Sequence, residues 1–250
     1  MIRIKTDAEI DCMRESGKIT KETLDYLGSR IKPGMTTKEL DALAYEFILS
    51  CGATPSFLGY SGFPASICAS IDDSVVHGIP SDDIVIKEGQ IVSIDTGVIY
   101  NGWQGDAART FCIGEVSPLK QKLVKVTEEC FFKAIEHLRD GSPIGDIGYY
   151  VQTHAEANGF SVVRALTGHG IGREMHESPS IPNYGKKGTG IRLKKGMSLA
   201  IEPMINVGTE KVRMLGDGWG VVTADGKLSS HYENSIAITD NGVINLTLLD

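Results

Sequence analysis

The chain has 250 residues, 41% of them hydrophobic and 23% charged, and carries a formal net charge of -7 at pH 7. This composition excludes an intrinsically disordered protein, and the negative charge argues against a DNA-binding protein that mainly grips phosphates. Without a signal peptide or a run of eighteen apolar residues, the chain is expected to be cytoplasmic, with no membrane partner. The five cysteines lack CxxC spacing, which predicts reduced thiols.

Helix-start signals predict two helices in each half of the chain. Each signal is a Ser or Thr cap followed either by Glu three residues later or by Pro, and each helix is expected to stop near a glycine. The expected helices cover residues 7–28, 37–52, 118–141 and 143–159.

The two helical pairs have similar spacing. Gly34 to Gly52 covers the same eighteen steps as Gly141 to Gly159, with apolar positions in register. This fits either an internal duplication or two unrelated amphipathic helices. We expect a single domain, residues 1–250, with two similar halves at roughly 1–112 and 113–250.

Apolar, β-branched segments follow each helical pair and predict strands. Helices followed by strands in both halves indicate an α+β domain in which helices cover a sheet. Residues 176–190 are rich in Pro, Gly and Ser and are expected to form a long surface loop. The expected strands lie within residues 65–71, 84–100, 160–166, 197–207 and 234–249.

A hairpin in the first half brings two acids together. Asn101 and Gly102 form a two-residue turn between alternating strands. The resulting register places Asp106 opposite Gly97 and makes Asp95 its diagonal neighbour on the same face, about 7 to 8 Å away at the backbone. No Lys or Arg lies between the two acids, so either a bound cation compensates their charge or this face is wet. We favour the cation.

Three more metal donors follow downstream. They are His169 in TGHGIG, Glu202 in LAIEPM and Glu233 in HYENSIAIT. Each alone is a weak signal, since single histidines in turns and acids at strand ends usually face water. One imidazole and four carboxylates together could hold two divalent ions.

In this order and in these local contexts, the five donors resemble the ligand set of the methionine aminopeptidases, within the wider creatinase and aminopeptidase fold. The match extends through HGIP, DTGVIYNGWQGDAARTF, GHGIGREMHE, IEPM and YENSIAIT, over essentially the whole chain. The resemblance implies a pita-bread fold, in which two pairs of helices cover a curved antiparallel sheet with pseudo-two-fold symmetry. It also implies a short, bacterial-type monomeric enzyme that removes the initiator methionine from nascent polypeptides.

The resemblance also implies a role for each donor. Asp95 and Asp106 would chelate and bridge two divalent ions (Co, Mn, Fe or Zn), with Glu233 as the other bridge, and His169 and Glu202 would complete one site. A metal-bridging water would be the nucleophile. Glu202 would also carry the proton to the leaving amine.

Further residues match the family's substrate site. His77 and His176 correspond to two non-ligand histidines that would bind the substrate amide and stabilise the developing oxyanion. An aromatic and sulfur-lined slot suits a methionine side chain. The positions that match this slot are Tyr60, Phe63, Cys68, Met175 and Trp219.

Three positions depart from the family pattern. Asp72 replaces the usual Asn, which puts the hydrogen bonds near the substrate mouth in doubt. Met175 replaces a more usual aromatic residue, and Phe57 occupies a place often held by a smaller one. We therefore expect a reshaped methionine slot.

Two other functions compete with this one. A proline-directed peptidase shares the five ligands but usually carries a large additional N-terminal domain. A metal-free binding module of the same fold would have eroded ligands, whereas all five ligand types are intact here. The lysines at positions 186, 187, 194 and 195 could contact ribosomal RNA, although a solvated charged face is the simpler interpretation.

Overall fold

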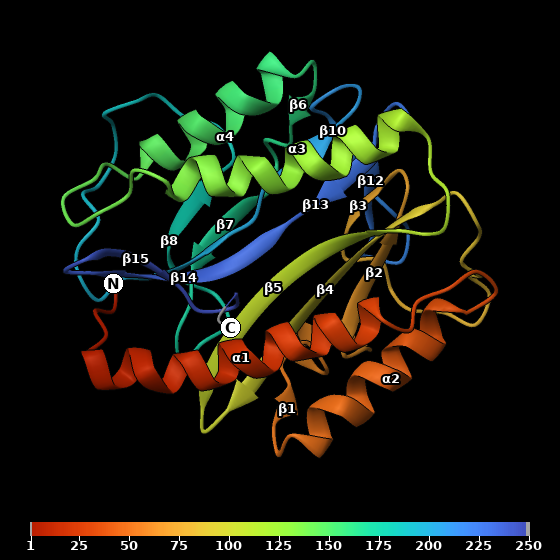
Figure 1. Ribbon diagram of the computed structural model, residues 1–250, viewed down its shortest axis with the longest axis horizontal. Coiled ribbons are helices and arrows are strands. Elements are labelled where there is room, and N and C mark those ends of the chain that lie inside the picture. The colour runs from red at the N-terminus through yellow and green to blue at the C-terminus, as the bar shows by residue number, and fades with distance from the viewer. Residues whose placement is uncertain (1, 249–250) are drawn as a thin grey trace.

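The computed structural model describes residues 2–248 and, within them, arranges four α-helices around a curved antiparallel sheet (Figure 1). In this view α3 and α4 lie toward the top and α1 and α2 toward the bottom, with most of the sheet between the two pairs. None of the described helices combines the length and apolar character that crossing a membrane requires. The helices are α1 (Asp7–Gly28), α2 (Thr37–Ser50), α3 (Pro118–Ile135) and α4 (Gly145–Ala157).

The first helical pair begins where the sequence predicted. Thr6 and Thr36 both form reciprocal capping boxes, with Glu9 and Glu39. The second pair differs from the prediction, because α3 ends at Ile135 rather than near residue 141 and α4 begins at residue 145 rather than 143.

The segment between α3 and α4 pairs with a distant part of the chain instead of extending either helix. The N–H of Gly141 donates to the carbonyl of Leu193 at 2.8 Å, and the N–H of Leu193 donates to the carbonyl of Ser142 at 2.8 Å. An isolated β-bridge also joins Pro143 to Arg192. These tertiary hydrogen bonds satisfy backbone groups that the capping rules had placed inside helices.

A nine-stranded sheet forms the centre of the molecule. Its strands run in the order β1-β4-β5-β14-β9-β7-β8, with β2 added to β4 and β15 added to β14, and every pair is antiparallel. The strands are β1 (Thr54–Pro55), β2 (Ile67–Ile71), β4 (Ile91–Tyr100), β5 (Trp103–Cys112), β7 (Thr167–Gly170), β8 (Glu177–Pro182), β9 (Ser198–Ile201), β14 (Glu233–Thr239) and β15 (Gly242–Asn245).

Two three-stranded sheets complete the described fold. One has the order β13-β10-β6 and the other β11-β12-β3. Their strands are β3 (Ser74–Val76), β6 (Ser161–Val162), β10 (Met204–Asn206), β11 (Val212–Met214), β12 (Val221–Thr223) and β13 (Ser229–His231).

Several strand and loop predictions need correction. The expected strand at 84–100 begins only at Ile91, and the one at 160–166 covers only residues 161–162. Residues 177–182 form the edge strand β8 instead of a loop, because an edge position tolerates prolines that would break a central strand. The expected strand at 197–207 is two strands, β9 and β10, interrupted at Glu202 and Pro203. The last expected strand, at 234–249, is also two strands, β14 and β15, interrupted at Asp240 and Asn241; β15 ends at Asn245, and Leu249 lies outside the described residues.

The central hairpin β4–β5 is buried on both faces. Val92 and Ile94 pack with Leu24 and Leu27 of α1, which places the even-numbered side chains of β4 against the first helical pair. Asp95 and the other odd-numbered residues therefore face the opposite side, and β4 is buried through residue 98. The alternative of a wet face is therefore wrong, and the two acids are enclosed.

Candidate active site

The β4–β5 hairpin has the predicted register. Asp106 lies opposite Gly97, and Asp95 lies opposite Ala108, so the two acids are diagonal neighbours on one face. The exposed fractions of Asp95 and Asp106 are only 9% and 4%. Asn101 and Gly102 have φ values of 50° and 75°, which a two-residue hairpin turn of this hand requires.

The sheet order brings the other three donors to these acids. Glu233 begins β14 next to β5, His169 lies on β7, and Glu202 follows the last residue of β9. The Nε2 atom of His169 is 3.7 Å from Asp106 Oδ2 and 3.8 Å from Glu202 Oε1. All five predicted donors thus converge on one point, although they come from positions spread over 139 residues of sequence (95 to 233).

Burial shifts the pKa values of the four carboxyl groups upward. Burial raises the pKa of Asp95 to about 7. Burial, followed by repulsion from neighbouring carboxylates, raises the pKa values of Asp106, Glu202 and Glu233 well above the usual range. Within residues 2–248, no Lys or Arg forms an ion pair with any of the four.

These residues fit a divalent metal centre. One buried oxygen in each of Asp95, Asp106 and Glu233 has no hydrogen-bond partner. Two groups of ligand atoms each lie within 4.8 Å of one another, namely Asp95–His231–Glu233 and Asp106–His169–Glu233. Unpartnered buried oxygens and clustered carboxylates are stable near neutral pH when a cation compensates their charge.

The imidazole of His169 has the orientation of a metal ligand. Its Nδ1–H donates to the carbonyl of Gly170 at 2.9 Å, which leaves Nε2 as the nitrogen with a lone pair, directed at the carboxylates. Burial, together with the nearby His176, lowers the pKa of His169 to about 4. The ring is therefore neutral at physiological pH, as metal binding requires.

His77 and His176 lie beside this donor cluster. The ring of His176 is 4.3 Å from that of His169, centroid to centroid, and its Nδ1 shares a hydrogen bond of 2.8 Å with the hydroxyl of Tyr60. His77 has a φ of 60°, a strained conformation for a non-glycine residue. Burial lowers the pKa of both histidines, so both are neutral hydrogen-bonding groups at pH 7.

A cavity of about 140 Å³ joins the donor cluster to an apolar slot. Every residue that the sequence analysis placed in the metal, catalytic or substrate site lines it, together with Phe57. Phe63 and Trp219 meet edge to face, 5.1 Å apart, and the ends of Met175 and Phe57 crowd Gly97 on β4. The cavity is smaller than the sites that hold drug-sized molecules, and its size suits a single side chain.

Asp72 lies outside this cavity. Its Oδ1 accepts a hydrogen bond from the N–H of Ile91 at 3.2 Å and forms an ion pair with Lys120 at 2.6 Å. Asp72 instead lines a separate surface hollow, so its replacement of Asn acts on the β2–β3 turn and not on the residues that line the candidate site.

His231 is a site residue that the sequence analysis missed. It ends β13, is 1% exposed, and its Nε2 lies 3.7 Å from Glu233 Oε2. Burial lowers its pKa to about 3. A signal was available, because residues two apart in extended chain share a face, and HYE places His231 two positions before Glu233.

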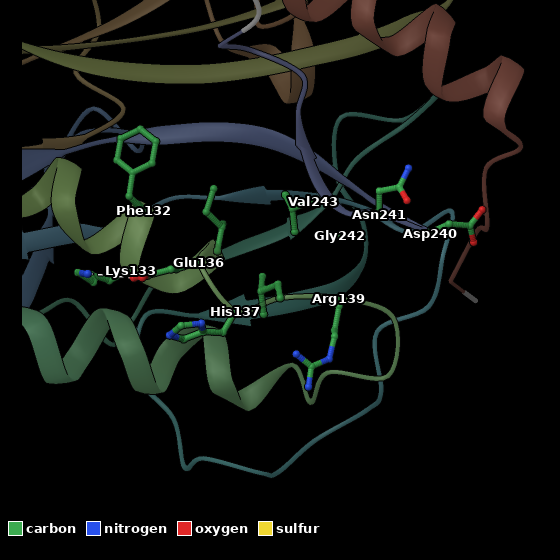
Figure 2. Close-up of a pocket in the computed structure, with 11 residues that line it drawn as sticks. Phe132, Lys133, Glu136, His137, Arg139, Asp240, Asn241, Gly242 and Val243 are labelled. Atoms are coloured by element: carbon green, nitrogen blue, oxygen red, sulfur yellow. Dashed lines mark hydrogen bonds and ion pairs between the residues drawn. The ribbon is translucent and has the colours of Figure 1, made fainter.

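A larger surface hollow of about 790 Å³ lies elsewhere, between the end of α3 and the β14–β15 turn (Figure 2). Its charged residues include Lys133 and Glu136, which form an ion pair with each other at 2.9 Å, and Arg139 points away from them. Because these groups lack the buried, unpartnered donors of the smaller cavity, the chemistry belongs to the smaller one.

Comparison with known proteins gives a consistent result. Residues 11–240 match the model of metallopeptidase family M24. The methionine aminopeptidase of Clostridium acetobutylicum is 55% identical over 250 residues, which cover 100% of both chains. The crystal structure of methionine aminopeptidase from Rickettsia prowazekii superposes with a TM-score of 0.97 at 46% identity, covering 99% of this chain and 100% of that one.

Proline-specific relatives share the fold at lower similarity. The Xaa-Pro dipeptidase from Bacillus anthracis superposes with a TM-score of 0.79 at 24% identity, and this chain covers 62% of it. The additional length of that protein agrees with the expectation that such enzymes carry a further domain. The chain therefore belongs to metallopeptidase family M24 and, within that family, to the methionine aminopeptidases.

Proposed function

We propose that this protein is a metal-dependent aminopeptidase that hydrolyses the N-terminal methionine from peptides and nascent chains in the cytoplasm. The observation that carries the proposal is the cavity of about 140 Å³ in which buried, unpartnered metal donors open directly onto a slot of aromatic and thioether side chains. One end suits hydrolysis and the other suits an unbranched, polarisable side chain.

The proposed metal ligands are the five residues found from the sequence. Asp95, Asp106 and Glu233 would hold and bridge two ions, and His169 and Glu202 would complete one position. When bound, two divalent ions of cobalt, manganese, iron or zinc would supply an activated water as nucleophile and polarise the scissile carbonyl.

The protein's own side chains would handle the proton and the developing charge. We assign proton transfer from the attacking water to the leaving amine to Glu202, because its carboxyl lies at the cavity wall and burial raises its pKa. Neutral His77 and His176 would donate hydrogen bonds to the substrate amide and the oxyanion. The hydroxyl of Tyr60 would keep the ring of His176 in position.

The slot would select methionine by shape and contact. Phe63 and Trp219 supply aromatic surface, and the buried Cys68 and Met175 supply sulfur. Burying a flexible thioether among these groups recovers the apolar contact that a shorter or charged side chain would lose.

Methionine release from Met-Ala-Ser tests the proposal. Wild type, Asp106→Asn and the exposed-residue control Asp82→Asn would be stripped of metal and titrated with Mn or Co. We expect metal-dependent release by wild type and the control, with a loss of at least about 100-fold in Asp106→Asn. Cleavage of Xaa-Pro peptides without release from Met-Ala-Ser would indicate a proline-directed enzyme. Silence from wild type with every ion would overturn the proposal.

The proposed function also suggests how the protein associates with itself and with partners other than its substrate. We propose that the enzyme acts as a monomer, which light scattering at working concentration would test. A transient ribosome contact through the Lys186–Lys195 region has less support, because Lys195 is paired with Asp7 and Asp240. Co-sedimentation with ribosomes at several salt concentrations would decide it.

A further inference from the structure

His231 has no role in the proposed function, although its ring reaches the donor cluster. Its Nε2 is fully enclosed and has no hydrogen-bond partner. Two carboxylate oxygens lie within 4 Å of this nitrogen, Glu233 Oε2 at 3.7 Å and Glu202 Oε2 at 3.9 Å. A buried nitrogen aimed at two carboxylates without bonding either one needs an explanation.

The distances match shared coordination better than hydrogen bonding. An N–H···O hydrogen bond spans about 2.7 to 3.2 Å, so neither contact of His231 is one. Two ligand atoms that each lie about 2.1 Å from one ion are about 3.0 to 4.2 Å apart, depending on the angle between them. The spacing of His231 falls inside that range.

His169 provides an internal reference for this geometry. Its Nε2 lies 3.7 Å and 3.8 Å from two carboxylate oxygens, nearly the same distances as those of His231. The two histidines belong to separate ligand groups, one with Asp106 and the other with Asp95, and both groups share Glu233. The cluster thus contains two similar three-residue sites joined by one carboxylate.

We propose that His231 is a sixth metal ligand, which gives the Asp95–Glu233 position an imidazole of its own. This inference rests on the proposed two-metal function and adds a ligand to one of its positions. A position with only carboxylates suits hard ions such as Mn, whereas an imidazole shifts preference toward Co, Fe and Zn. His231 would therefore make the second position more selective for these borderline ions.

The discriminating variant is His231→Gln. A glutamine amide can still donate a hydrogen bond from a similar place, but it is a poor ligand for Co or Zn, so it separates coordination from mere positioning of Glu202 and Glu233. His154→Gln is the matched control, because His154 also pairs with a carboxylate, that of Glu129 at 2.8 Å, but neither His154 nor Glu129 belongs to the two ligand groups of the donor cluster. Circular dichroism of the metal-free proteins would verify folding.

Metal titration by calorimetry gives the first readout. We expect wild type and His154→Gln to bind two Co ions, and His231→Gln to bind one of them at least about tenfold more weakly. The loss should be smaller for Mn than for Co. Unchanged binding of both Co ions by His231→Gln would overturn the inference and leave a positioning role.

A measurement on wild type alone guards against a variant that fails to fold. In the Co-loaded protein, the exchangeable ring N–H of each coordinated histidine gives a strongly shifted proton NMR signal. Two such signals at two equivalents of Co are expected, and a single signal would reject the sixth ligand. An active wild-type enzyme with a single signal would refute this inference alone, whereas a wild type that binds no metal would refute the proposed function as well.

Discussion

Gly97 lies next to Met175 and Phe57, two residues that line the proposed methionine slot, and replacing Gly97 with a larger residue tests how that slot is built. A Cβ added at this position would lie 2.8 Å from the end of Met175, 2.8 Å from the ring of Phe57 and 2.9 Å from Ser56. These contacts are too short, but two of the three atoms are far ends of side chains that border the cavity. We expect Gly97→Ala to push Met175 and Phe57 into the slot.

The size of the effect follows from the apolar contact that the substrate loses. If the shifted side chains deprive the substrate of apolar contact equal to about one to two methylene groups, at about 0.8 kcal/mol each, the substrate loses about 1 to 1.5 kcal/mol of binding free energy. Because about 1.4 kcal/mol corresponds to a factor of ten, KM for Met-Ala-Ser should rise about five- to tenfold. The kcat should change little, since the loss is the same in ground and transition states.

Gly105→Ala is the matched control on the partner strand. Its added Cβ would lie 2.9 Å from backbone atoms of Ser16 and Gly17 in α1, which cannot swing aside. Overpacking of this kind costs about 1 to 3 kcal/mol of the free energy of unfolding. Urea unfolding and Met-Ala-Ser kinetics would be measured for both variants. A Gly97→Ala protein as unstable as Gly105→Ala, with an unchanged KM, would show that the slot is not where we place it.

Three further outcomes are expected. Burial raises the pKa of Asp95 to about 7, so below that pH a metal ion must displace a proton, and affinity for Mn or Co should fall as the pH decreases below about 7. Calorimetry in buffers of different ionisation enthalpy would detect the released proton, and the absence of proton release would contradict the raised pKa. Tyr60→Phe removes the hydroxyl bonded to His176, and a hydrogen bond worth about 0.5 to 1.5 kcal/mol predicts a two- to tenfold lower kcat, with stability by urea unfolding as the control. Burial raises the pKa of the Cys130 thiol to about 12, so iodoacetamide at pH 8 should label the exposed Cys12 and leave Cys130 unlabelled. Peptide mass mapping would measure the labelling, and equal labelling of the two would mean that Cys130 is accessible.

Local features of the chain were readable from the sequence because neighbours along the chain decide them. The capping boxes at Thr6 and Thr36 depend on residues three positions apart, and the Asn101–Gly102 turn sets the register that pairs Asp106 with Gly97. The resemblance supplied the remaining site residues, all of which line the cavity. The duplication of the two halves remains a prediction.

Long-range contacts decided the rest. The first residues expected in α4 instead pair with the segment around Leu193, and residues 177–182 form an edge strand only because β7 provides a partner. His231 illustrates the same limit at the site. Its place two residues before Glu233 is visible in the sequence, but the sequence alone does not show that Asp95, more than a hundred positions earlier, lies beside it. Spacing along a strand is a local property, whereas the meeting of β4, β5, β7, β9 and β14 depends on how the whole sheet and its helices exclude water.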